Sequence, residues 1–282
     1  PSGPSAAVAL ERHAGAGGSG PMGVALDASG NAWVVNYGSN TVTKINSSDG
    51  VTRNYAVGSS PRGVAIDASG NAWVANYSSG TVTKINSSDN TTSSYFAGSG
   101  PYGVAVDASG NIWVSNASGN SVNELSSSGS LLRTYNIGSN SYGIAVDALG
   151  NVWVANNANA VTKINSSDGT TRNYAVGSSP IGVTIDASGN VWVANLLGNN
   201  VTKLNSSGNL IGTYPVGNGP YGIAVDASGN ILVSNRTGNT ITRLSPLGVP
   251  IATYNVGNYP YSFGDFTGFA LQYFVLGYSL PN

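Results

Sequence analysis

The sequence predicts an all-β protein, a β-propeller of four-stranded blades, and three observations support this. A segment of about 40 residues recurs along most of the 282-residue chain, and its copies begin at Gly23, Gly63, Gly103, Gly143, Gly182 and Gly222. Each copy holds four short stretches rich in β-branched and aromatic residues. No copy shows the apolar spacing of an amphipathic helix.

The second copy shows the expected elements in order. We expect strands at residues 63–66, 72–75, 81–85 and 92–97. The D-A-S-G-N sequence after the first strand is typical of a tight turn, because Asp and Ser bond nearby backbone and Gly accepts positive φ. The N-S-S-D-G sequence found in other copies indicates the same after the third strand. The fourth copy is one residue shorter at 156–160, which we interpret as a loop.

Two further positions recur in register. The five tryptophans occupy one position of the second strand, at Trp33, Trp73, Trp113, Trp153 and Trp192, with Leu232 in the sixth copy. A large apolar residue there is expected to fill the space between adjacent blades. A third-strand position carries Lys44, Lys84, Lys163, Lys203 and Arg243, with Glu124 in the third copy. We interpret that second set as a solvated face.

The two ends of the chain decide the number of blades. Six full copies end near Gly257, and the terminal segments 1–19 and 259–282 together match about one more copy. We therefore predict a single propeller domain over residues 1–282, with a seventh blade shared by both termini that closes the ring. The alternative is a six-bladed ring whose terminal segments pack elsewhere.

Composition excludes several classes of partner and site. The net charge is −1 and no Lys/Arg run occurs, so nucleic acid is not an expected partner. The absence of cysteine excludes disulfides and thiolate metal sites, and the sequence has no apolar run long enough to insert into a membrane. We expect a monomer that is secreted or at the cell surface, because the chain is rich in N-x-S/T acceptors and its start at Pro1 fits a cleaved signal peptide.

The repeat also carries a family resemblance. The pattern G-P-x-G-V-A-V-D-A-S-G-N-x-W-V-x-N, over roughly residues 20–258, resembles NHL-repeat propellers, especially the virginiamycin B lyase branch. The resemblance implies a ring with a central channel, and in the lyases histidines and glutamates hold magnesium and abstract a proton. This chain has only His13, Glu11 and Glu124 of these types, at positions that do not share a loop end. No lyase catalytic residue can be carried over. Separately, the low charge and the near-identical copies are typical of an extracellular prokaryotic repeat protein.

Residues that could act as a general acid or base are also scarce among the aspartates. Nine of the ten aspartates belong to the two recurring turns, where turn formation explains them. One carboxylate per turn is sparse for a calcium ion, which takes six to eight oxygen ligands. We therefore predict no catalytic residue, no metal site and no cofactor, and do not expect an enzyme.

Candidate binding residues are found where the copies differ. The residue before each first-strand glycine reads Met22, Arg62, Tyr102, Tyr142, Ile181, Tyr221 and, in the terminal copy, Tyr261. The residue after the W-V-x-N asparagine reads Tyr37, Tyr77, Ala117, Asn157, Leu196 and Arg236. Blade topology places both positions around one mouth of the channel, where Tyr and Arg side chains suit a glycan or peptide. The alternative is ordinary exposed tyrosine in a Tyr-rich chain.

Three functions follow as hypotheses. The leading one is a non-catalytic extracellular binding or adhesion module whose ligand-binding residues are the mouth residues Tyr37, Arg62, Tyr77, Tyr102, Tyr142, Tyr221, Arg236 and Tyr261. The second is a divergent lyase or lactonase with a divalent cation in the channel. The third is a structural spacer in a surface layer.

Overall fold

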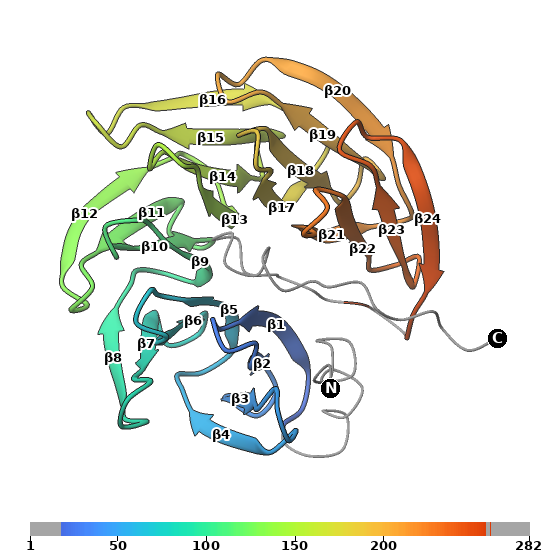
Figure 1. Ribbon diagram of the computed structural model, residues 1–282. Helices are drawn as coiled ribbons and strands as arrows, with labels where there is room; N and C mark the ends of the chain where they lie inside the picture. Colours follow the sequence, from blue (N-terminus) through green and yellow to red (C-terminus); the bar gives the residue numbers. More distant parts are fainter. Residues whose placement is uncertain (1–17, 258–259, 261–282) are drawn as a thin grey trace.

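The computed structural model describes residues 18–257 and 260, and the strands in this part form six antiparallel four-stranded sheets. The sheets are arranged as blades around a common centre (Figure 1). The prediction of an all-β propeller is confirmed, and the six described blades match the alternative blade number. None of the described residues forms a helix that could cross a membrane.

The strands follow the chain from the centre outwards in every blade. The first two blades are β1 (Pro21–Leu26), β2 (Ala32–Asn36), β3 (Thr41–Ile45), β4 (Thr52–Ala56), β5 (Pro61–Ile66), β6 (Ala72–Asn76), β7 (Thr81–Ile85) and β8 (Thr92–Phe96). The next two are β9 (Pro101–Val106), β10 (Ile112–Asn116), β11 (Ser121–Leu125), β12 (Leu131–Asn136), β13 (Ser141–Val146), β14 (Val152–Asn156), β15 (Ala160–Ile164) and β16 (Thr171–Ala175). The last two are β17 (Pro180–Ile185), β18 (Val191–Asn195), β19 (Asn200–Leu204), β20 (Leu210–Pro215), β21 (Pro220–Val225), β22 (Ile231–Asn235), β23 (Thr240–Leu244) and β24 (Pro250–Asn255).

The inner strands of neighbouring blades approach so closely that a side chain would not fit between them. A Cβ atom added to Gly63 of β5 would lie 2.8 Å from the carbonyl oxygen of Tyr102 in β9. One added to Gly143 of β13 would lie 2.5 Å from that of Ile181 in β17. Real Cβ atoms are essentially never this close to other heavy atoms. The glycine that opens each of the first five repeats is therefore a packing requirement at the centre of the ring.

The tryptophans pack between blades, as the sequence indicates. Trp73 is fully buried in one apolar cluster with Val104, Ile112 and Leu125 of the following blade. Its ring also lies 5.9 Å from that of Tyr95 on the outer strand of its own blade. A buried aromatic residue in each interface supplies much of the apolar area that joins one blade to the next.

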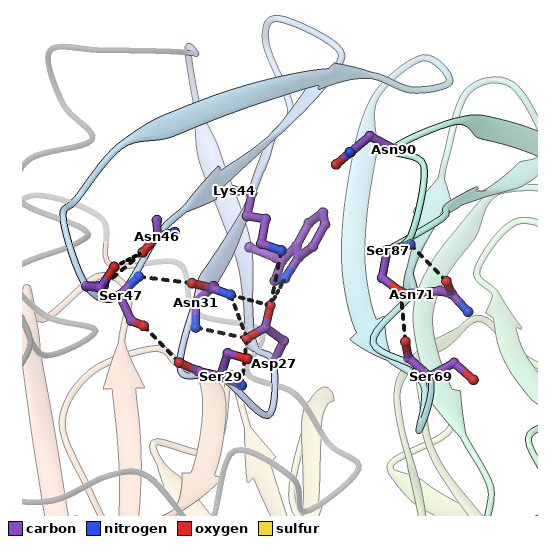
Figure 2. A network of polar contacts seen from close by, with 12 residues as sticks. Asp27, Ser29, Asn31, Lys44, Asn46, Ser47, Ser69, Asn71, Ser87 and Asn90 are labelled. Carbon is purple, nitrogen blue, oxygen red and sulfur yellow. Dashed lines mark hydrogen bonds and ion pairs between the residues drawn. The ribbon is translucent and has the colours of Figure 1, made fainter.

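The turn after each inner strand anchors that tryptophan by hydrogen bonds. In the first blade, the Asp27 carboxylate accepts the backbone N–H groups of Ser29 and Asn31, at 3.0 Å each (Figure 2). It also accepts the Trp33 indole N–H at 3.1 Å. Asn31 also bonds Asp27 and accepts the N–H of Ser47 in the second turn. The aspartate is a turn residue, as predicted, and its bond to the indole is an additional role that the sequence analysis missed.

The recurring lysines do not form a solvated face, so that interpretation is wrong. Lys44 lies 4.7 Å from the centre of the Trp33 ring and 3.5 Å from the Asp27 carboxylate. Lys203 is only 7% exposed. The four-carbon stem of a lysine can cover apolar surface while its ammonium group meets a ring face and a carboxylate. These lysines therefore belong to the interface between blades.

The predicted shared blade lies almost entirely outside the described residues. It was assigned to residues 1–19 and 259–282, of which only Gly18, Ser19 and Pro260 are described. Each inner strand packs against the inner strand of the following blade, from β1 with β5 through to β17 with β21. Among the described strands, β21 and β1 do not pack on each other in this way.

Candidate functional site

The two variable positions of the repeat lie together on one face of the ring, which we call the mouth face. The residue before the inner-strand glycine is the second residue of the inner strand. The residue after the W-V-x-N asparagine bonds the loop that leads into that strand, as the backbone N–H of Tyr77 donates to the carbonyl of Ser60 at 3.1 Å. Arg236 and Gly219 repeat this bond at 2.8 Å. Blade topology thus places the two positions as the sequence analysis expected.

Arg62 is the centre of an aromatic cluster on this face. Its guanidinium carbon lies 4.8 Å from the Tyr37 ring centre, 5.0 Å from that of Tyr77 and 5.1 Å from that of Tyr102. The three rings come from the first three blades. We call Arg62, Tyr37 and Tyr77, with Tyr102 packed against them, the Arg62 platform. A cation held against several aromatic faces is fixed in position before any ligand arrives.

The edge of the platform is accessible. Tyr37 is 39% exposed, and Tyr77 and Arg62 are half-buried. The Tyr77 hydroxyl bonds the Ser118 hydroxyl of the third blade at 3.0 Å. Within the described part of the chain, the one hydrogen bond recorded for the Arg62 guanidinium goes to the sulfur of Met22, a weak acceptor, at 3.9 Å.

Two tyrosines from distant blades meet across the ring. The hydroxyls of Tyr102 in the third blade and Tyr221 in the sixth blade form a short hydrogen bond. Tyr102 is 5% exposed and Tyr221 is 6% exposed, and both pack with Met22, Ala117 and Ile181. Burial, followed by the effect of Tyr221, raises the pKa of Tyr102 well above its ordinary value. These two predicted ligand-binding residues therefore form a plug under the mouth and not an open rim.

The remaining predicted residues border this plug. Tyr142 is half-buried, with its ring edge-on to that of Tyr102 at 5.2 Å. The Arg236 guanidinium lies 5.5 Å from the centre of the Tyr221 ring. Tyr261 lies outside the described residues. The structure thus brings the other seven predicted residues together, and divides them into an accessible platform and a buried plug.

A metal centre does not fit the part of the chain that the structure describes. Between residues 18 and 257, no three His, Cys, Asp or Glu side chains are grouped so that they could hold a metal ion. Glu124 is the one glutamate in that range, and His13 and Glu11 lie outside it. The magnesium chemistry that the lyase resemblance implies has no donor set among these residues, so no catalytic step is derived from it.

Comparison with known proteins agrees with the repeat pattern and the blades. The model of the virginiamycin B lyase family matches residues 9–259. The chain belongs to the virginiamycin B lyase family. No curated protein matches it.

Solved structures of lyases and of one extracellular domain share the fold. A streptogramin B lyase structure matches with a TM-score of 0.80 and 19% identity, over 88% of this chain and 87% of that one. An inactive virginiamycin B lyase from Staphylococcus aureus, crystallised with quinupristin, matches with a TM-score of 0.79 and 22% identity, over 84% and 85% of the two chains. The extracellular domain of a one-component system from B. thetaiotaomicron matches with a TM-score of 0.70 and 17% identity, over 88% of this chain and 37% of that one.

Proposed function

We propose that the protein is a non-catalytic binding module that recognises a glycan or a peptide on its mouth face. The Arg62 platform is the observation that carries the proposal, because three tyrosine rings hold one guanidinium group at an accessible edge. Rings and guanidinium groups are enriched in binding hot spots, since they supply large contact area and several directed donors.

The platform suits a ligand with a flat apolar face and polar edges. The exposed Tyr37 ring can stack on the C–H face of a sugar or on a peptide side chain. The Arg62 guanidinium can donate to hydroxyl or carboxylate oxygens, with which it makes charge-assisted hydrogen bonds. Because the rings already pack on Arg62, binding loses little side-chain entropy.

The plug indicates where the ligand would lie. Tyr102 and Tyr221 are buried against each other in the centre of the ring, so the mouth face offers its rim and not a deep pocket there. A ligand would therefore lie across the first two blades, over Tyr37, Arg62 and Tyr77. This geometry favours an extended glycan or peptide over a small molecule enclosed in the channel.

A secreted or cell-surface location belongs to the same proposal. The chain has few charged residues and many Asn, Ser and Thr residues, as the sequence analysis noted. The propeller of the one-component system that shares this fold is an extracellular domain. Glycans and peptides displayed outside the cell would then be its ligands.

Glycan and peptide arrays probed with labelled protein test the proposal. We expect binding on one of the two arrays, and at least about a tenfold loss of affinity for Tyr77→Ala, equal to about 1.4 kcal/mol. Phe96→Ala is the matched control, because Phe96 is a 68% exposed aromatic residue of the same blade, outside the platform. Equal binding by the Tyr77 variant would contradict the site, and no ligand on either array would favour the structural spacer.

A lyase remains the second candidate, because the family match covers residues 9–259. An inactive variant of one family member was crystallised with quinupristin, so that compound is the substrate to test. This candidate predicts a divalent cation in the purified protein and a cleavage product detectable by mass spectrometry. A protein free of metal that leaves quinupristin intact with added magnesium would exclude this lyase activity.

A further inference from the structure

The lysines of the third strands hold their ammonium groups in a recurring site between blades. Four of them lie over the tryptophan ring of their own blade, 4.6 to 5.0 Å from its centre, namely Lys44, Lys84, Lys163 and Lys203. Three donate to a backbone carbonyl in the second turn of the next blade, Lys84 to Ser127 at 3.1 Å, Lys163 to Ser206 at 3.0 Å and Lys203 to Pro246 at 2.8 Å. Lys203 also lies 3.9 Å from the carboxylate of its turn aspartate, Asp186. The complete site therefore consists of a ring face, a turn carboxylate and a carbonyl, and each of the other three lysines has two of these three contacts recorded.

The third blade keeps this site but lacks its cation. Glu124 stands at the lysine position and accepts hydrogen bonds from the Tyr135 hydroxyl at 3.1 Å and the Asn111 side chain at 3.4 Å. The turn aspartate, Asp107, still accepts the Trp113 indole N–H at 2.9 Å. Among the five tryptophans, all within the described residues, Trp113 is the one with no lysine recorded over its ring.

A cavity of about 500 Å³ lies at this place, between the third and fourth blades. Asp107, Trp113 and Glu124 line it from one side. Ser166 lines it from the other side, at the repeat position of Ser127 and Ser206, whose carbonyls bind lysine in other blades. The groups that would surround an ammonium ion are thus present around an open space.

A second departure from the repeat lines the same cavity. Leu149 occupies a turn position that is serine in the other five copies, at Ser29, Ser69, Ser109, Ser188 and Ser228. Its side chain is 79% exposed. An exposed leucine in place of serine adds apolar surface beside two carboxylates, which suits a ligand with an alkyl chain next to a cation.

The charge at the cavity also differs from that in the first blade. The ionisable side chains that line it are Asp107, Glu124, Arg133 and Tyr135. Arg133 is exposed, its guanidinium donates to the Tyr135 hydroxyl at 3.3 Å, and it makes none of the ion pairs recorded for the described residues. The formal charge of the lining groups is −1, because Arg133 offsets one of the two carboxylates. The equivalent position in the first blade carries Lys44 opposite Arg53.

We propose that this cavity binds an external primary ammonium group carried on an alkyl chain. The ammonium would occupy the place of the missing lysine, over the Trp113 ring, with N–H donors to Asp107, Glu124 and the Ser166 carbonyl. The alkyl chain would lie against Leu149. The group can belong to a free diamine or to a lysine side chain of a peptide, since both present the same chemistry. The site is on the opposite face from the Arg62 platform and does not depend on the proposed binding function.

Tryptophan indole N–H signals in a ¹⁵N–¹H correlation spectrum report on this site directly. We expect 1,5-diaminopentane, added at pH 7, to shift the Trp113 signal to saturation and to leave the signals of the other four tryptophans in place. Trp113→Phe identifies the signal. A blocked tripeptide with a central lysine is titrated in parallel to distinguish a free diamine from a peptide lysine. The ligand that binds at least tenfold more tightly identifies the natural source of the ammonium group. 1-Pentanol, which lacks the charge, should have no effect.

Two variants of Glu124 complete the test. Glu124→Lys restores the residue found in four other blades, so the variant should fold and its Trp113 signal should no longer respond to the amine. Glu124→Gln should weaken binding of the amine at least fivefold. This variant tests the proposal if Glu124→Lys fails to fold. The proposal is overturned if Trp113 does not respond, if all five signals move alike, if Glu124→Lys responds like wild type, or if Ca²⁺ shifts Trp113 and the amines do not.

Discussion

The face opposite the mouth face carries the D-A-S-G-N turns, and we call it the turn face. In each of the first five blades, the tryptophan indole N–H donates to a turn aspartate on this face, as Trp33 does to Asp27. On the mouth face, the residue before the inner-strand glycine changes from Arg62 to Tyr102 to Ile181. Both faces are built by the same copies. The difference shows that shared positions hold one blade to the next, whereas variable positions are free to specify a ligand.

The comparison also makes departures from the repeat informative. Glu124 occupies a framework position of the turn face, where four other blades carry lysine and one carries arginine. The same glutamate on the mouth face would not stand out, because several residue types already occur at the variable positions there. Each blade therefore serves as an internal control for the others.

The largest expected difference between the faces is in stability. Trp153→Ala removes a fully buried side chain that packs with the next blade, and should lower the free energy of unfolding by about 3 to 5 kcal/mol. Tyr77→Ala removes a half-buried side chain and should cost about 1 kcal/mol. Denaturant unfolding measures both. If both variants lost the same free energy of unfolding, the Arg62 platform would be as important for stability as the tryptophans between blades, and the two faces would not differ in this respect.

A smaller effect is expected from the plug at alkaline pH. The pKa of Tyr102 is raised in the folded protein, so the folded state keeps this proton when the unfolded state has lost it. The resulting stability is complete below pH 10 and is lost as the pH rises above that value, since the unfolded state then binds fewer protons. The free energy of unfolding should therefore fall less steeply above pH 10 in Tyr102→Phe than in wild type. Identical slopes would contradict a buried, protonated Tyr102.

The fold and the location of the candidate site follow from the sequence because both depend on the repeat register. The period, the turn residues and the tryptophan position predict the blades, and the register alone places Tyr77 beside the loop before Arg62. The contacts of the side chains do not follow in the same way. Tyr102 and Tyr221 are 119 residues apart and meet only because the ring brings opposite blades together.

The lysine position shows which signal was overlooked. Every tryptophan with a lysine ten or eleven residues later, as in Trp33 and Lys44, has that lysine over its ring. The two residue types recur together and lie opposite each other on paired strands, Trp33 on β2 and Lys44 on β3. Strand pairing could have predicted this contact, because cross-strand neighbours on one face interact. The lysine position was interpreted as a solvated face because lysine side chains are mostly exposed in proteins.

Hydrogen–deuterium exchange with the tightest array ligand tests most directly whether recognition belongs to the mouth face. We predict slower exchange in the loops 37–40, 57–60 and 77–80, which surround the Arg62 platform, and unchanged exchange in the turns 27–31 and 67–71 on the opposite face. Protection confined to those turns, or absent from all of these segments, would contradict the assignment of the mouth face as the binding surface.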